Sequence, residues 1–180
     1  MTTLSEFREM KDAFFRAGGG SPLTREQKKT FAGLHYFEEN AVLRCRVPLE
    51  KYPVLERIQM QTSTGQIAPY LKYAVARFDV GGEKQALQVY KSEEHDSLFL
   101  PFTDATTGKE SYAAGRYLDP EEQGDGTLTL DFNLAYNPYC AYNDQWSCPL
   151  PPPENRLPVR IDAGEQNFHD DRDSPGLFRK

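Results

Sequence analysis

Four polar side chains in the second half of the sequence have the types that acid–base or anion-binding chemistry needs: Asp104, Arg116, Asp131 and Asn133. Asp131 and Asn133 alternate with apolar neighbours, so we expect them to share one face of a strand. Two carboxyl groups in unlike environments can serve as a general acid and a general base, and a guanidinium can bind a carboxylate or phosphate. We therefore take Asp104 and Asp131 as candidate catalytic groups and Arg116 as a candidate anchor for an anion. The alternative is a structural Arg–Asp pair that ties turns together.

The segment 131–155 differs from the rest of the chain, because it holds three of the ten tyrosines, the only tryptophan and five of the thirteen prolines. Connections between elements usually have about 4–6 residues, so a loop of this length needs a reason. Buried aromatic rings and their polar tips need partners, which indicates an ordered loop. One interpretation is the wall of a pocket; the other is a loop that plugs one end of the β-structure and satisfies itself. The candidate ligand-binding residues are Arg116, Asn133, Tyr136, Asn137, Cys140, Tyr142, Asn143 and Glu154.

The cysteines do not form a recognisable metal or nucleophile motif. Seven residues separate Cys140 from Cys148, whereas zinc sites use closer pairs with further Cys or His at similar spacing. None of the three histidines lies near Cys140 in the sequence to serve as its base. The three glycines at 18–20 are not followed by the lysine of a phosphate-binding loop. We therefore expect no metal and no cofactor, with Cys140 interpreted as a small buried apolar group.

Two short helices are expected near the N-terminus. Thr3 and Glu6 fit a capping box, and apolar residues recur at helical spacing up to Ala17, before the glycine run. Thr24 begins a second capping box and a short helix that we expect to end near Phe31.

From Leu43 onward the apolar residues alternate with a period of two, which is typical of strands. Glycine-containing turns lie between the alternating segments, and no long helix separates them, so the strands should be mostly antiparallel. We predict a mainly β fold, an antiparallel barrel or sandwich of about eight strands. The expected strands include 43–47, 54–60, 71–76, 87–89, 98–102, 112–118, 128–134 and 157–161.

The expected organisation is a helical segment, residues 1–34, packed on a β domain, residues 35–166. The polar remainder, residues 167–180, is expected to be a loosely held tail.

The charge distribution disfavours nucleic acid as a partner. Of the 21 basic and 27 acidic residues, residues 61–180 hold 11 and 19, and this acidic excess would repel a phosphate backbone. No segment approaches the ~18 consecutive apolar residues that span a bilayer. The first 17 residues lack the apolar core of a secretory signal, and the chain has only three cysteines, so we expect a cytoplasmic protein with free thiols.

Several linked sequence blocks resemble a bacterial and archaeal family that is catalogued only as a domain of unknown function. The resemblance extends from about Ser21 to Glu165 and implies no activity, because no catalytic residue is established for that family. Some longer relatives carry an N-terminal module that resembles a forkhead-associated fold. This sequence does not show that module, so the resemblance does not imply phosphopeptide binding. The blocks are Ser21-Pro22-Leu23, 31–34, Tyr36-Phe37, 104–108, Ser111-Tyr112, 115–118, 130–133, 135–138, 140–142 and 148–155.

Two functional hypotheses follow from the residues. The first is a pocket beside the loop 135–155 that binds a small polar or anionic molecule, with or without acid–base catalysis. The second is a non-catalytic structural or protein-interaction domain in which the loop serves only stability. The sequence does not decide whether the protein is an enzyme.

Overall fold

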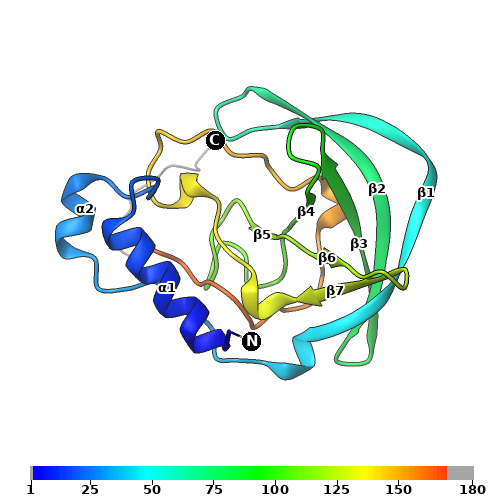
Figure 1. Ribbon diagram of the computed structural model, residues 1–180, viewed down its shortest axis with the longest axis horizontal. Coiled ribbons are helices and arrows are strands. Elements are labelled where there is room, and N and C mark those ends of the chain that lie inside the picture. Colours follow the sequence, from blue (N-terminus) through cyan, green and yellow to red (C-terminus); the bar gives the residue numbers. More distant parts are fainter. Residues whose placement is uncertain (1, 170–180) are drawn as a thin grey trace.

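The computed structural model describes residues 2–169 of the 180-residue chain. Two α-helices precede a sheet of seven strands, and short 3-10 turns interrupt the connections (Figure 1). The helices are α1 (Leu4–Ala17) and α2 (Arg25–Thr30). The strands are β1 (Arg44–Gln61), β2 (Ile67–Val80), β3 (Glu83–Ser92), β4 (Leu98–Phe102), β5 (Arg116–Leu118), β6 (Glu121–Glu122) and β7 (Thr127–Asp131).

Both predicted helices are present, and their capping boxes form. The Glu6 amide donates to the Thr3 hydroxyl at 3.2 Å, and the Thr3 amide donates to the Glu6 carboxylate at 2.7 Å. Helix α1 ends at Gly18, as predicted from the glycine run. Thr24 caps α2 in the same way, so the start of each helix follows from local sequence chemistry.

The sheet is antiparallel throughout, as predicted, with the strand order β5-β4-β3-β2-β1-β7-β6. It has seven strands rather than eight. The expected strands 43–47 and 54–60 are two parts of the single long strand β1, whose register shifts between Lys51 and Glu56. The expected strand 112–118 is shortened to β5, because turns occupy residues 112–115 and Gly115 has a φ of +92°.

The sheet curls into a half-barrel rather than a complete barrel or a sandwich. Its two edge strands, β5 and β6, are consecutive in the chain and only Asp119 and Pro120 separate them. Strands β1 and β2 lie on the side of the molecule opposite to the helices (Figure 1). The main core fills the concave side of the curl and includes Leu87, Leu100, Phe102, Leu128, Leu130, Phe132 and Ile161.

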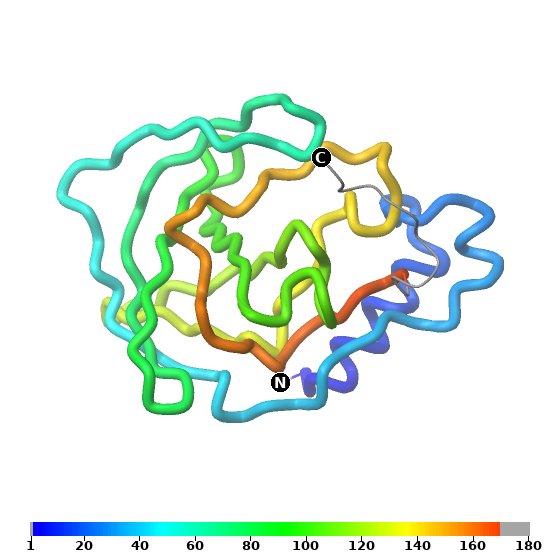
Figure 2. The backbone as a smooth tube through the Cα atoms, turned by 180° about the vertical axis from the view of Figure 1, so that it is seen from behind, coloured from blue at the N-terminus to red at the C-terminus, as the bar shows by residue number. Residues whose placement is uncertain are grey.

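The expected strand 157–161 is not a strand, although its alternation marks burial correctly. Leu157 and Ile161 are buried, yet this segment forms no ladder with the sheet. Figure 2 shows the chain from about residue 155 onward crossing the back of the molecule in an extended path. Three backbone hydrogen bonds join it to the residues after β4: the Thr103 amide donates to Asn155 O at 3.0 Å, the Leu157 amide to Thr103 O at 2.8 Å and the Ala105 amide to Val159 O at 3.0 Å.

The segment that was expected to be a loose tail is described only up to His169, and residues 170–180 lie outside the described part. Asn167 donates to Lys109 O at 2.9 Å, and the Phe168 ring lies 5.0 Å from the Tyr142 ring. Within residues 2–169 no helix has the length and apolar character needed to cross a bilayer.

Candidate functional site

Arg116, the expected anion anchor, is the largest of the fully buried side chains in the described part of the chain. It projects from β5 into the space between the sheet and the crossing segment 157–165. Its Nη1 donates to the carbonyl oxygens of Ala163 and Glu165, and its Nη2 donates to Ile161 O at 2.9 Å. Asp104 Oδ1 accepts from the same Nη2 at 3.3 Å. Sequence reasoning paired Arg116 with a carboxylate, and the structure brings Asp104 to it.

Asp104 completes this arrangement from the other side. Its carboxylate accepts from the Ile161 amide at 2.8 Å and from the amide and hydroxyl of Thr106 at 3.2 and 3.0 Å. The side chain of Asp104, like that of Arg116, has no exposed surface. The two charged groups therefore bind the backbone of the crossing segment from Ile161 onward, beyond the backbone bonds that Leu157 and Val159 make with Thr103 and Ala105.

The expected strand face shared by Asp131 and Asn133 does not exist, because β7 ends at Asp131 and Asn133 lies in the 3-10 turn Phe132–Leu134. The Asp131 carboxylate caps that turn, accepting from the amide and side chain of Asn133 at 3.1 and 2.9 Å. Asn133 in turn binds both backbone groups of Asn40, at 2.7 and 3.0 Å. Within residues 2–169 no hydrogen bond or ion pair joins this group to the Asp104–Arg116 pair.

Two loop residues and one residue of helix α1 meet a carboxylate that the sequence analysis did not select. Glu165 is fully buried, and its Oε2 accepts from the Asn137 amide at 2.8 Å and from the Tyr142 hydroxyl at 2.7 Å. Its Oε1 lies 2.5 Å from Lys11 Nζ of helix α1. Burial, followed by the charge of Glu165, raises the pKa of Tyr142 well above its usual value, so Tyr142 remains a hydrogen-bond donor.

The remaining loop candidates lie apart from this cluster. The Asn143 side chain donates to Pro22 O, which holds the loop against the N-terminal segment. Glu154 is largely exposed, with Lys72 at 3.3 Å and the Tyr90 hydroxyl at 3.1 Å. Cys140 is partly exposed and adjoins Cys148 and Tyr112.

A second cluster, which we call the central hollow, consists of Tyr70, Phe99, Tyr117, Asp119 and Tyr136. Phe99 stacks on Tyr70, with 5.0 Å between ring centroids, and meets Tyr117 edge to face at 4.7 Å. Tyr117 meets Tyr136 edge to face at 5.7 Å. The Tyr136 hydroxyl lies 3.0 and 2.9 Å from the two carboxylate oxygens of Asp119 and donates to that carboxylate.

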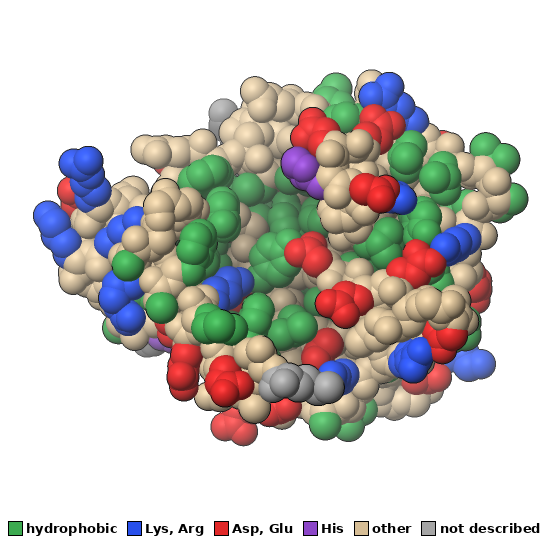
Figure 3. Space-filling model, in the orientation of Figure 1, with side chains coloured by type: hydrophobic (Ala, Val, Ile, Leu, Met, Phe, Trp, Pro, Cys, Tyr) green, Lys and Arg blue, Asp and Glu red, His purple; other side chains and the backbone are tan. Residues whose placement is uncertain are grey.

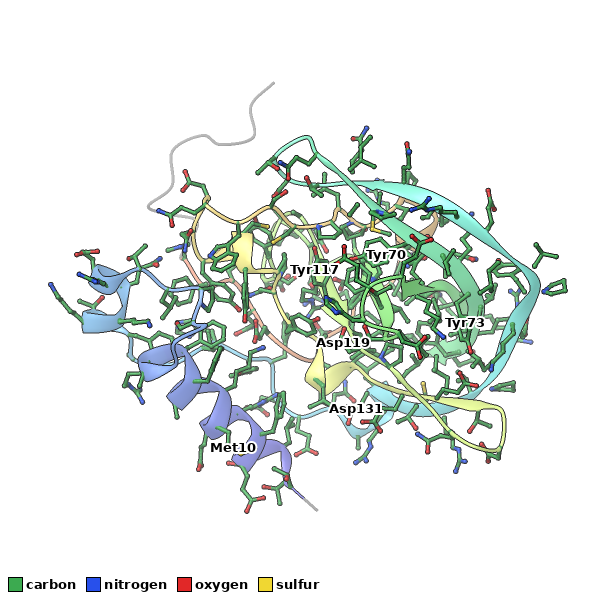
Figure 4. All side chains as sticks on the ribbon, turned by 45° about the horizontal axis from the view of Figure 1, so that its top comes forward. Met10, Tyr70, Tyr73, Tyr117, Asp119 and Asp131 are labelled. Atoms are coloured by element: carbon green, nitrogen blue, oxygen red, sulfur yellow. The ribbon has the colours of Figure 1, made fainter. Side chains whose placement is uncertain are left out.

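The central hollow lies on the face shown in Figure 3, which is hollowed in the middle and has hydrophobic side chains at its floor and acidic side chains along its edge. Figure 4 shows Tyr70, Tyr117 and Asp119 together in the middle of the molecule. Phe99 and Tyr117 are nearly buried, Tyr70 and Tyr136 are partly buried, and Asp119 is exposed. Strands β2, β4 and β5 supply the floor, and the loop 135–155 supplies Tyr136.

The electrostatics of the central hollow set the protonation of its polar groups. Desolvation raises the pKa of Asp119, although the Tyr136 hydrogen bond and the charge of Lys11 act in the opposite direction. Desolvation, reinforced by Asp119, raises the pKa of Tyr136 far above its usual value. Lys11 Nζ lies 4.9 Å from the centroid of the Tyr136 ring, which it reaches across from α1. The hollow therefore presents neutral phenols and one carboxylate, with the Lys11 ammonium against the Tyr136 ring.

Sequence reasoning missed Glu165, Asp119 and Tyr70. The odd-numbered residues from 157 to 165 point mostly inward, and Glu165 is one of them. A charged residue at an inward position was the signal in the sequence that could have identified it. Asp119 and Tyr70 carry no local signal, because the curl of the sheet is what brings β2 and the β5–β6 connection together. Among residues 2–169, no group of three or more His, Cys, Asp or Glu side chains could hold a metal ion.

Comparison with known proteins agrees with the resemblance seen in the sequence. A family model described as a protein of unknown function, DUF1684, matches residues 29–166. The chain belongs to the DUF1684 family. Its fold is similar to that of an uncharacterised protein of Haloarcula marismortui solved by solution NMR, with a TM-score of 0.70, 40% identity and 91% of each chain covered. No match is found among curated proteins.

Proposed function

We propose that this DUF1684 protein binds a small organic molecule in the central hollow, beside the loop 135–155. The observation that carries the proposal is the exposed carboxylate of Asp119 at the edge of an aromatic floor. Aromatic rings offer stacking surface, and a partly desolvated carboxylate binds donors more strongly than one in water.

The chemistry of the hollow favours a ligand with a ring and a protonated amine. The aromatic floor offers surface to the ring of the ligand, and the Asp119 carboxylate offers a counter-charge to its amine. Figure 3 shows further acidic side chains around the edge of the hollow. The sequence suggested a polar or anionic ligand, and the anionic choice rested on Arg116. Because the Arg116 guanidinium has no exposed surface and is bound by Asp104 and backbone carbonyls, we propose a polar, cationic ligand instead.

Calorimetric titration with tyramine tests this proposal, with phenol and glucose as probes that lack the amine. Tyramine should bind, and neither phenol nor glucose should match its affinity. Asp119→Asn should weaken tyramine binding about tenfold or more, since a hydrogen bond to a charged group contributes about 1.5–3 kcal/mol. Tyr70→Ala should also weaken it, because a stacking surface is lost.

Asp79→Asn is the matched control, because Asp79 is an exposed carboxylate at the far end of β2. This variant removes the same charge from the protein and should leave tyramine binding unchanged. Equal losses in Asp79→Asn and Asp119→Asn would indicate a general effect of net charge and would reject the site.

The second candidate is a non-catalytic domain whose loop serves only stability. The observation in its favour is that the Asn137 amide and the Tyr142 hydroxyl both donate to the buried Glu165 carboxylate. It predicts that tyramine does not bind and that Tyr142→Phe lowers the melting temperature. The tyramine titration separates the two candidates, because loss of stability in Tyr142→Phe is compatible with both.

A further inference from the structure

Three polar side chains lie around the sulfur of Cys140. The Tyr112 hydroxyl lies 3.7 Å from Cys140 Sγ, and the Cys148 thiol and the Ser63 hydroxyl are close enough to lower the pKa of Cys140. These groups come from three separate parts of the chain: the turn before β5, the β1–β2 connection and the end of the loop. Such convergence stabilises a thiolate, which is the nucleophilic form of cysteine.

Cys148 is fixed directly beside Cys140. The Cys140 amide donates to Cys148 Sγ at 3.3 Å, and the Cys148 amide donates to the Ser63 hydroxyl at 3.1 Å. Cys140 is partly exposed, whereas Cys148 is buried. A partly exposed cysteine with a second, buried cysteine next to it is the arrangement of a reactive cysteine and its resolving partner.

We propose that Cys140 and Cys148 form a reversible redox site, in which a hydroperoxide oxidises Cys140 and Cys148 closes a disulfide with it. This inference is independent of any ligand in the central hollow. It also differs from the interpretation of Cys140 as a small apolar group.

The chemistry balances with a hydroperoxide as the two-electron oxidant. The Cys140 thiolate attacks the terminal peroxide oxygen, so an S–O bond forms and the O–O bond breaks; the leaving alkoxide takes a proton from solvent. The Cys148 sulfur then attacks Cys140, the S–S bond forms, and the sulfenic oxygen leaves as water. Overall, two thiols and one hydroperoxide give one disulfide, one alcohol and one water. A dithiol reductant reverses the change.

The acidities of the thiols agree with this assignment of roles. Hydrogen bonding from Cys148, followed by that from Tyr112 and Ser63, overcomes desolvation and lowers the pKa of Cys140 to about 6. The same hydrogen bond and burial raise the pKa of Cys148. Cys45 is an internal reference within the chain, because burial and then the charge of Asp131 raise its pKa.

The full-length protein treated with equimolar hydrogen peroxide tests the proposal by mass spectrometry. We expect the loss of two hydrogen atoms, reversed by dithiothreitol, and a cross-link between the peptides of Cys140 and Cys148. In Cys148→Ser the reaction should stop at a sulfenic acid on Cys140, trapped by dimedone. Cys45→Ser is the matched control and should give the same disulfide as the unchanged protein.

The rate of alkylation by iodoacetamide gives an independent readout. At pH 6, Cys140 should react roughly tenfold faster than Cys45, since its larger thiolate fraction outweighs its lower intrinsic nucleophilicity. The titratable groups that face Cys140 are Cys148, Tyr112 and, farther off, Tyr117. Tyr112→Phe should move the midpoint of the pH–rate profile upward. Equal rates at Cys140 and Cys45, or peroxide treatment that leaves Cys140 and Cys148 unlinked, would overturn the proposal.

Discussion

Arg116 is an anion anchor in one interpretation of the sequence and part of a structural Arg–Asp pair in the other. Its surroundings in the structure lead to a stability prediction. The guanidinium lies 5.5 and 5.3 Å from the centroids of the Phe37 and Phe102 rings, with Asp104 as its carboxylate partner. Asp104→Asn leaves this buried cation without its counter-charge. We expect the free energy of unfolding, measured with urea, to fall by about 3–5 kcal/mol.

The control for this prediction is the exposed pair of Arg77 and Glu50, whose atoms approach to 3.1 Å. Water screens this pair, so Glu50→Gln should change the free energy of unfolding by less than about 1 kcal/mol. If Asp104→Asn costs no more than Glu50→Gln, the buried pair does not hold the crossing segment as we infer.

For single residues, the sequence indicates which chemical groups are important but not where in space their partners lie. It offered a structural Arg–Asp pair as the alternative to an anion anchor, and Asp104 is the carboxylate that Arg116 meets. It could not place Glu165, since a long-range contact with Tyr142 and Lys11 gives the residue its role.

Helix α1 docks through one face, and a pair of substitutions in it tests that docking. Phe15 is 1% exposed and meets the Tyr142 ring edge to face at 4.9 Å, whereas Met10 is 57% exposed. Phe15→Ala should lower the free energy of unfolding in urea by about 3–5 kcal/mol, because it leaves a cavity between the helix and the loop. Met10→Ala in the same helix should change it by less than about 1 kcal/mol. Similar effects of the two substitutions would mean that the helix contributes little through packing.

Local signals explain which elements the sequence predicts well. The boundaries of α1 follow from a capping box and a glycine run, both of which act within a few residues. Strand ends were predicted less well, because the period-two pattern reports burial and not hydrogen-bonded pairing. Residues 157–161 have the pattern without the ladder, and β5 is shorter than its alternation suggested.

The curl of the sheet is a property of the whole molecule that no single segment encodes. The alternation of apolar residues and the turns between them predict an antiparallel sheet. How far that sheet curls depends on the order in which distant strands pair, which these local patterns do not indicate. The half-barrel leaves an open side, and the crossing segment fills it with Leu157, Ile161 and Ala163. The central hollow exists because the same curl brings β2 near the β5–β6 connection, so its residues could not be selected from the sequence.

Asn155 joins the crossing segment to the sheet and offers a test of this closure. Its side chain accepts from the Gln88 amide at 2.8 Å and donates to Gln88 O at 2.9 Å and Pro101 O at 2.7 Å. Asn155→Leu keeps a similar volume but leaves three buried backbone groups without these partners, each at about 1–3 kcal/mol. We expect hydrogen exchange to accelerate at β3 and β4 more than at Leu128 of β7. Asn143→Leu, which removes the bonds to Pro22 O and from the Gln145 amide at the periphery, should leave those amides protected. Uniform acceleration in all strands would show that Asn155 supports overall stability without a specific role in closing the half-barrel.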